Sequence, residues 1–171
     1  LDRARHVRDG AVRRAAERLG LGPERGRLRR ARFGAFGGSL AHQEIVFNLR
    51  VLLGRLLAGT LYRPAHEMRL MIGPRVRYPD VLVFAGPLEQ TTRTLTDAVA
   101  IFEVLSDDTA TTDRVEKLIE YTEVPSLRAY VLLEQTAMAA TLFQREPGGA
   151  WTATAHTAGD LVLPGIELTI P

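Results

Sequence analysis

The sequence predicts an α/β fold, in which helices flank a mixed β-sheet. Three observations lead to this prediction. Apolar residues recur at the spacing of an amphipathic helix over residues 45–57. Short apolar segments bounded by polar residues, glycine or proline follow, as is typical of strands. A second helical pattern, starting near residue 111 and ended by Pro125, separates two such segments and can serve as a crossover between neighbouring strands.

The first 36 residues form a basic, divergent N-terminal segment. They contain 11 arginines against four acids, whereas residues 37–171 carry a net charge of −5 and would form the folded domain. We expect a weak basic helix over residues 3–19 and mostly irregular chain over 20–38. Such a segment binds nucleic acid in some proteins and is a solvated tail in others, and composition does not decide between them.

The first strong helical pattern follows Ser39, which is the expected N-cap because its hydroxyl can accept a hydrogen bond from a backbone N–H of the first turn. The apolar stripe consists of Ile45, Val46, Leu49, Leu52, Leu53, Leu56 and Leu57.

Six segments then read as strands, with the second helix after the third of them and "PGG" as a turn between the last two. The expected order is therefore α-β-β-β-α-β-β-β. The segments are "EMRLMI" at 67–72, "YPDVLVF" at 78–84, "VAIFEVLS" at 99–106, "AYVLLEQ" at 129–135, "AATLFQRE" at 139–146 and "WTATAH" at 151–156.

Composition and motifs exclude several classes of protein. The chain has no cysteine, which excludes a disulfide scaffold, a thiolate zinc site and a cysteine nucleophile, and suits a reducing compartment such as the cytoplasm. It has no apolar run of about 18 residues, so we expect no membrane-spanning helix, and we expect no secretory signal. It also lacks a phosphate-binding GxxxxGK[ST] loop, a G-x-S-x-G elbow and an H-E-x-x-H zinc motif.

Two acids stand out because each interrupts an apolar strand segment. Asp80 lies in "YPDVLVF" and Glu103 lies in "AIFEVLS". A carboxylate among apolar residues is costly unless it is paired, hydrogen-bonded or bound to metal, although either acid could instead face solvent or pair with an arginine. If the two lie side by side, they form an oxygen-rich site suited to Mg²⁺ or Mn²⁺.

Lys117 is the only lysine in the chain and the third candidate. At 100° per residue it shares a helix face with Arg114 and Tyr121, away from the apolar face. A lysine near a metal-bound phosphate could orient water or stabilise developing charge. The alternative is a solvated lysine flanked by Asp113 and Glu120, and helix geometry alone favours that alternative.

The motifs "GGSLAHQEIVFNL", "YPDVLVF", "FEVLSDDTATTDRVEKLIEY", "PSLRAYVLLEQ" and "GDLVLPGIEL", in this order, resemble the Uma-two family of bacterial endonuclease-like proteins. The resemblance covers residues 36–171 and implies the restriction endonuclease-like fold of the PD-(D/E)XK nuclease superfamily. It implies that Asp80 and Glu103 are metal ligands. Leu105 occupies the position where the superfamily motif has lysine, and Lys117 matches the lysine that takes over in proteins like this one.

Further positions could support this site. Arg114, from its place on the second helix, could help to hold the DNA backbone. His42 is expected to be a packed or capping histidine rather than a ligand, and Glu67 to be either a third ligand or a charge at a strand end. The positions typical of the family are Ser106, Asp113, Tyr121 and His42.

The chain departs from the family before "GGS". Relatives usually carry a strand like "YELIDGEVYAM" there, whereas this chain has "GRLRRARFGAF" and lacks the glutamate.

Two functions remain open on the sequence. The first is a metal-dependent endonuclease that hydrolyses DNA phosphodiester bonds with Mg²⁺ or Mn²⁺. The second is a catalytically inactive module with a nuclease-like fold that binds a partner or forms a homodimer. In that case the broken "EVL" motif would indicate that catalysis has been lost. The basic N-terminal segment could bind nucleic acid in either case.

Overall fold

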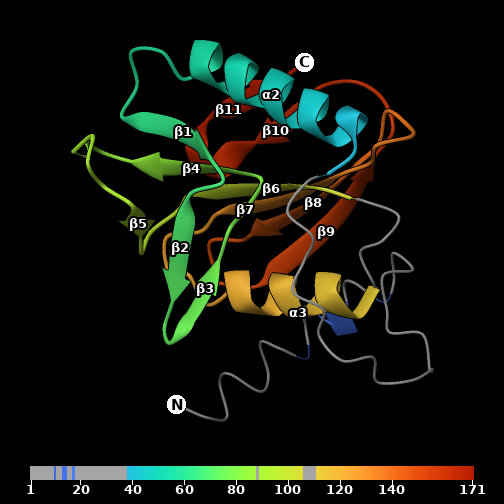
Figure 1. Ribbon diagram of the computed structural model, residues 1–171. Coiled ribbons are helices and arrows are strands. Elements are labelled where there is room, and N and C mark those ends of the chain that lie inside the picture. The colour runs from blue at the N-terminus through green and yellow to red at the C-terminus, as the bar shows by residue number, and fades with distance from the viewer. Residues whose placement is uncertain (1–9, 11–12, 15–16, 18–37, 88, 106–110) are drawn as a thin grey trace.

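A computed structural model describes residues 38–87, 89–105 and 111–171, together with positions 10, 13, 14 and 17 (Figure 1). The side chains of residues 111–113 are outside this description. Of the expected helix over residues 3–19, only positions 10, 13, 14 and 17 are described, and all four are helical. Nearly all of the expected irregular chain over 20–38 lies outside the description. The division of the chain at residue 36 therefore stays a prediction.

The centre of the fold is a six-stranded mixed sheet. Of the strand pairs that the described residues form in this sheet, β6 and β7 are the parallel one, and the helix α3 (Thr111–Tyr121) lies between these two strands in the chain. The other neighbours pair antiparallel. The strand order is β1 (Tyr62–His66), β4 (Val81–Ala85), β6 (Ala100–Val104), β7 (Ala129–Leu133), β8 (Ala140–Arg145) and β9 (Trp151–His156).

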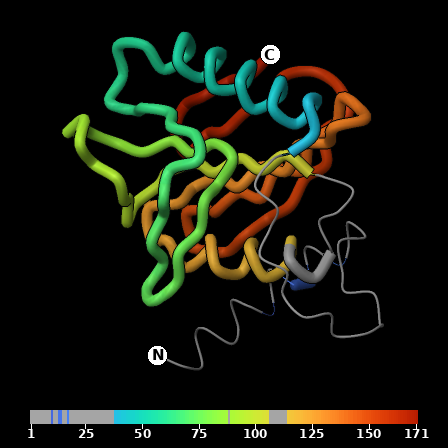
Figure 2. Tube along the Cα trace, viewed as in Figure 1, coloured from blue at the N-terminus to red at the C-terminus, as the bar shows by residue number. Residues whose placement is uncertain are grey.

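Different elements cover the two faces of this sheet (Figure 1). The helix α2 (Leu40–Leu56) and a C-terminal hairpin cover one face, and α3 and a small three-stranded sheet cover the other. The trace in Figure 2 shows the C-terminal hairpin returning beside α2. The remaining elements are β2 (Arg69–Ile72), β3 (Arg75–Arg77), β5 (Thr94–Leu95), β10 (Leu161–Leu163), the 3₁₀ turn η1 (Pro164–Ile166) and β11 (Leu168–Ile170).

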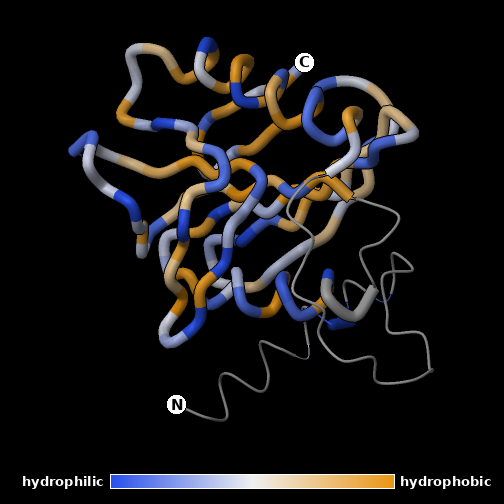
Figure 3. The backbone as a smooth tube through the Cα atoms, in the orientation of Figure 1, coloured by the Kyte–Doolittle hydropathy of each residue, from blue (hydrophilic) through white to orange (hydrophobic). Residues whose placement is uncertain are grey.

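Each face of the large sheet has its own core, because successive strand residues point to opposite faces. Leu82 and Ile101 pack with Leu118 of α3, whereas Val81 and Phe102 belong to the core under α2. All residues of β6 are buried for this reason. Figure 3 shows hydrophobic and hydrophilic residues alternating around α3, as expected for a helix with one buried side.

The structure confirms the predicted α/β fold with a mixed sheet. It also confirms the N-cap, since the Ser39 hydroxyl accepts a hydrogen bond from the His42 backbone N–H. The strands after the second helix lie where the sequence places them, and β9 matches its predicted range fully. Among the described residues, no helix combines the length and apolar character that crossing a membrane requires.

Three predictions about elements were wrong. The strand expected at 78–84 begins only at Val81, because Pro79 has no N–H to donate to a ladder. The second helix was expected to run up to Pro125, but it ends at Tyr121 and the chain then forms a turn. Five short strands were missed: β1, β3, β5, β10 and β11.

Candidate active site

The strand register brings Asp80 and Glu103 to the same end of the large sheet. Val81 pairs with Phe102 in the antiparallel ladder between β4 and β6. One step further along this register, Asp80 stands opposite Glu103, although it lies just before β4 and not inside it as predicted. Opposite residues of an antiparallel pair point to the same side, so the two acids are neighbours.

Asp80 is held by the sheet and by α2. Its Oδ2 accepts a hydrogen bond from the Val104 backbone N–H at 2.7 Å and lies 3.2 Å from Nε2 of His42. The aspartate and histidine side chains are 20% and 17% exposed, respectively. His42 was expected to be a packed or capping residue rather than a ligand, and in the structure its imidazole contacts the carboxylate of Asp80, a candidate metal ligand.

Gly38 explains how His42 reaches this place. A Cβ atom at position 38 would lie 2.6 Å from Cγ and Nδ1 of the His42 ring, which no real contact tolerates. The second glycine of "GGSLAH" therefore makes room for the imidazole, and Ser39 fixes the start of α2 next to it. Sequence reasoning had missed Gly38, and the usable signal was its spacing of four residues from His42.

Glu103 is almost fully buried, with 6% of its surface exposed, and it accepts two hydrogen bonds from α3. The Tyr121 hydroxyl donates to Oε1 at 2.7 Å, and the Lys117 ammonium donates to Oε2 at 3.3 Å. The two donors lie four residues apart and so project from one side of the helix. Lys117, at 24% exposure, therefore points toward the sheet, and the solvated alternative favoured by helix geometry was wrong.

Burial raises the pKa of Glu103 from 4.5 to about 7. The Lys117 charge and the hydrogen bonds from Tyr121 and Lys117 oppose this rise, while the negative charge of Asp80 adds to it. Burial and the neighbouring Glu103 raise the pKa of Tyr121 well above its usual value, so its phenol stays protonated as a donor. Near pH 7, the Glu103 side chain is therefore present in both its protonated and its ionised form.

Leu105, at the position where the motif would have lysine, is buried and apolar. The Leu105 side chain is buried in the core on the α3 side of the sheet, and its N–H donates to the carbonyl of Leu133. A lysine at 105 would have to displace this apolar packing, whereas Lys117 enters from α3 above it. Gln135 also ties this end of the sheet together, since it donates to the Leu105 carbonyl and accepts from Ser39.

The remaining supporting residues differ in their placement. Arg114 lines a small hollow with Glu103 and Lys117. Glu67 is exposed, has a φ of +49°, and donates its backbone N–H to the Asp80 carbonyl at 3.3 Å. Ser106 lies outside the described residues. Asp113 lies in α3, but its side chain is not among those described.

The donor set fits a hard divalent cation. Two carboxylates stand at one sheet end, and within the described residues no group of three or more acids, histidines or cysteines gathers that could hold a metal. A cation held by Asp80 and Glu103 would therefore complete its shell with water and substrate oxygens, as Mg²⁺ usually does.

Comparisons with known proteins agree with this architecture. Residues 36–171 match the family model "Uma2: Putative restriction endonuclease". Two Synechocystis proteins (strain PCC 6803), described as uncharacterized proteins sll1609 and slr1290, are 31% and 30% identical. The matches cover 69% and 78% of this chain, and 70% and 73% of the relatives.

A solved structure shares the fold. It is described as a "putative nuclease belonging to DUF820" from Anabaena variabilis, and it superposes with a TM-score of 0.63 at 15% identity. The match covers 88% of this chain and 87% of the other. At this identity the likeness concerns the fold alone.

Proposed function

This chain belongs to the Uma2 family of restriction endonuclease-like proteins, and on that basis we propose that it is a metal-dependent endonuclease that hydrolyses phosphodiester bonds in DNA. The observation that carries the proposal is the cross-strand pair of Asp80 and Glu103, with the Lys117 ammonium 3.3 Å from the Glu103 carboxylate. In this proposal the two acids hold Mg²⁺ or Mn²⁺. The chemistry that such a cation supplies is activation of water and neutralisation of charge on the phosphate.

The surrounding residues position the two acids. The Val104 N–H and the His42 imidazole fix the Asp80 carboxylate, so that it is oriented before any ligand arrives. Tyr121 fixes one oxygen of Glu103, and Lys117 contacts the other. Lys117 is also the cation best placed to stabilise charge that develops on the phosphate.

The protonated form of Glu103 would have to lose its proton when a cation binds, because a carboxylate ligand must be ionised. Its pKa of about 7 means that this loss requires little free energy near neutral pH. Metal affinity should therefore increase as pH rises through about 7 and level off above it.

The direct test is plasmid cleavage by the purified full chain with Mg²⁺ or Mn²⁺. Asp80→Ala should abolish cleavage, and Lys117→Met should lower its rate by roughly 100-fold, since removing one stabilising donor typically costs 10²–10³ in rate. Glu116→Gln is the matched control, because Glu116 lies next to Lys117 in the chain but is exposed. Cleavage that is unchanged in Asp80→Ala would refute the assignment.

One observation favours the alternative of a non-catalytic, self-associating module. The outer side of α2 exposes Leu40, Phe47 and Val51, with exposures of 74%, 68% and 36%. Their spacing of seven and four residues places them on one helix face. A second copy of this chain could cover the stripe and give a homodimer.

Two measurements separate these functions. Sedimentation velocity should show a dimer that Phe47→Glu converts to monomer if α2 is the interface, and a monomeric wild type would exclude it. Calorimetric titration with Mg²⁺ should show binding that Asp80→Ala removes if the site is active. A site that has lost its metal should give no such heat.

A further inference from the structure

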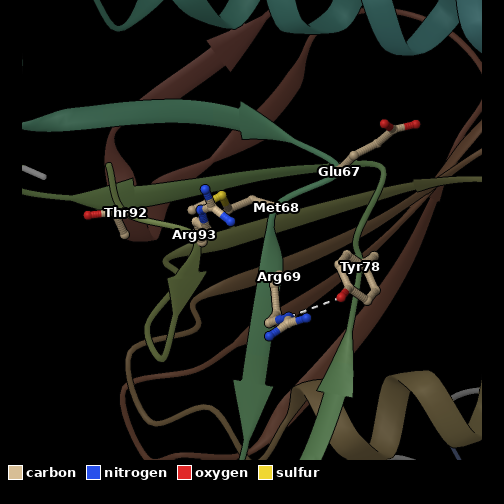
Figure 4. A pocket seen from close by; sticks show the side chains of 6 residues that line it. All are labelled: Glu67, Met68, Arg69, Tyr78, Thr92 and Arg93. Atoms are coloured by element: carbon tan, nitrogen blue, oxygen red, sulfur yellow. Dashed lines mark hydrogen bonds between the residues drawn. The ribbon is translucent and has the colours of Figure 1, made fainter. Parts of the chain in front are cut away.

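A second polar feature lies beside the candidate active site. It is a solvent-open hollow of about 420 Å³, and it lies where the chain enters β2 and β5 and leaves β3 of the small sheet (Figure 4). We call it the arginine–tyrosine hollow. Its lining residues are Glu67, Met68, Arg69, Tyr78, Thr92 and Arg93.

The sheet register gathers its key side chains. Leu70 pairs with Arg77 between β2 and β3, so Arg69 stands opposite Tyr78 one step further along. The Arg69 Nε donates a hydrogen bond to the Tyr78 hydroxyl at 3.0 Å, and the guanidinium carbon lies 5.9 Å from the ring centroid. Arg93 directly precedes β5, whose Thr94 pairs with Arg69. The hydrogen bond from Arg69 thus fixes the hydroxyl end of the Tyr78 ring, while the residue remains 52% exposed.

The arginines in and next to the small sheet fall into two groups. Arg77 forms an ion pair with Glu120 of α3, and Arg75 forms one with Glu123 in the turn that follows α3. Arg69 and Arg93, in contrast, form no ion pair with a carboxylate among the described residues.

Glu67 is the one acid among the residues that line the hollow, and it does not pair with either arginine. Figure 4 shows the Glu67 side chain pointing away from both Arg69 and Arg93. As far as the described part of the chain shows, the hollow therefore presents two guanidinium groups without a carboxylate partner beside an exposed aromatic ring.

We propose that this hollow binds an unpaired nucleotide of the substrate strand, so that the substrate is DNA with a single-stranded segment at the cleavage position. Tyr78 would stack on the base, and Arg69 and Arg93 would contact backbone phosphates. Exposed aromatic rings with adjacent cations bind single strands in this way, whereas the base faces of a duplex are covered by their neighbours. The inference rests on the proposed nuclease function, because that function makes a nucleic acid the ligand.

The hollow lies close enough to the candidate active site for one DNA strand to contact both. Tyr78 lies two residues before Asp80, a distance of at most about 7 Å along the chain. Glu67, on the rim of the hollow, donates its backbone N–H to the Asp80 carbonyl. A strand with a base on Tyr78 therefore has its neighbouring phosphates close to the two candidate metal ligands.

The test is binding of a fluorescently labelled oligothymidylate, followed by anisotropy with the full chain in EDTA, so that no cleavage is needed. Tyr78→Ala should weaken binding by roughly 5- to 150-fold, the usual effect of losing one stacked base. Tyr78→Phe should retain most of the affinity, because it keeps the ring. The Arg69→Ala/Arg93→Ala double variant should lower the slope of log K against log salt by about 1.4.

Arg63→Ala is the matched control for charge, since Arg63 is an exposed arginine on β1, outside the hollow, and should leave stacking unaffected. An affinity unchanged in Tyr78→Ala, with the variant folded by circular dichroism, would overturn the inference. Tighter binding of a blunt duplex of two annealed strands, which has no unpaired nucleotide, than of the oligothymidylate would also overturn it. If plasmid cleavage depends on Asp80 but Tyr78→Ala does not change oligothymidylate binding, the role of the hollow is refuted and the nuclease proposal stands. If Tyr78→Ala weakens binding but cleavage does not depend on Asp80, the nuclease assignment is refuted and the binding role of the hollow stands.

Discussion

Replacing Glu103 by glutamine should change how the stability of the metal-free protein depends on pH. Burial raises the pKa of Glu103 from 4.5 to about 7 in the folded chain. Between these two values the folded state binds a proton that the unfolded state has released. Stability therefore falls as pH rises through this window and is level above it. Glutamine cannot ionise, so the variant should lack this component.

The magnitude follows from the size of the shift. Each unit of pKa difference corresponds to about 1.4 kcal/mol, so a rise from 4.5 to about 7 amounts to roughly 3 kcal/mol. The unfolding free energy of the wild type minus that of Glu103→Gln should accordingly fall by roughly 3 kcal/mol between pH 4.5 and pH 8. Other titrating groups largely cancel in this difference.

Urea unfolding in EDTA, at intervals across that range, measures the effect. Glu116→Gln should show the pH dependence of the wild type, because the carboxyl it removes is exposed. Parallel curves for wild type and Glu103→Gln would refute the reasoning, since they would mean that the folded chain ionises Glu103 as readily as the unfolded chain does. Saturating Mg²⁺ should reduce the loss of stability above pH 7 in the wild type alone, if the proposed site binds it.

Two further predictions concern the residues around the acids. Tyr121→Phe should destabilise the fold by about 1–3 kcal/mol in urea unfolding, because it removes a donor from the buried Glu103; an unchanged midpoint would contradict the role of this hydrogen bond. Gly38→Ala should slow plasmid cleavage at least tenfold while leaving most of the unfolding free energy intact, because the new methyl group would displace the His42 ring. Gly148→Ala is its control, since a Cβ there meets no atom within 4 Å, and equal rates in the two variants would rule out the proposed role of the imidazole.

Sequence alone was sufficient for the elements with long, regular patterns. The stripe of α2, its Ser39 cap and the apolar runs of β6, β7 and β8 are local properties, because backbone geometry and side-chain periodicity set them within one segment. The short strands β3 and β5 were missed, since two or three residues are too few to show a period. Their pairing depends on segments elsewhere in the chain, such as β2.

The candidate site shows the same division. The sequence identified Asp80, Glu103 and Lys117 as unusual, because an acid in an apolar run and a lone lysine are visible without coordinates. It could not decide whether Lys117 faces solvent. The reach of Lys117 to Glu103 depends on the rotation of α3 against the sheet, which packing between distant segments sets.

Local patterns in the chain were enough to predict the fold class, the main helix, most of the long strands and the chemical types of the candidate site. Contacts between distant segments were needed to show that Asp80 stands opposite Glu103, that His42 contacts Asp80 and that Arg69 contacts Tyr78. The physical reason is that register and helix rotation are non-local. A shift of one residue in a strand turns every side chain to the other face, and only packing against the rest of the chain selects the register.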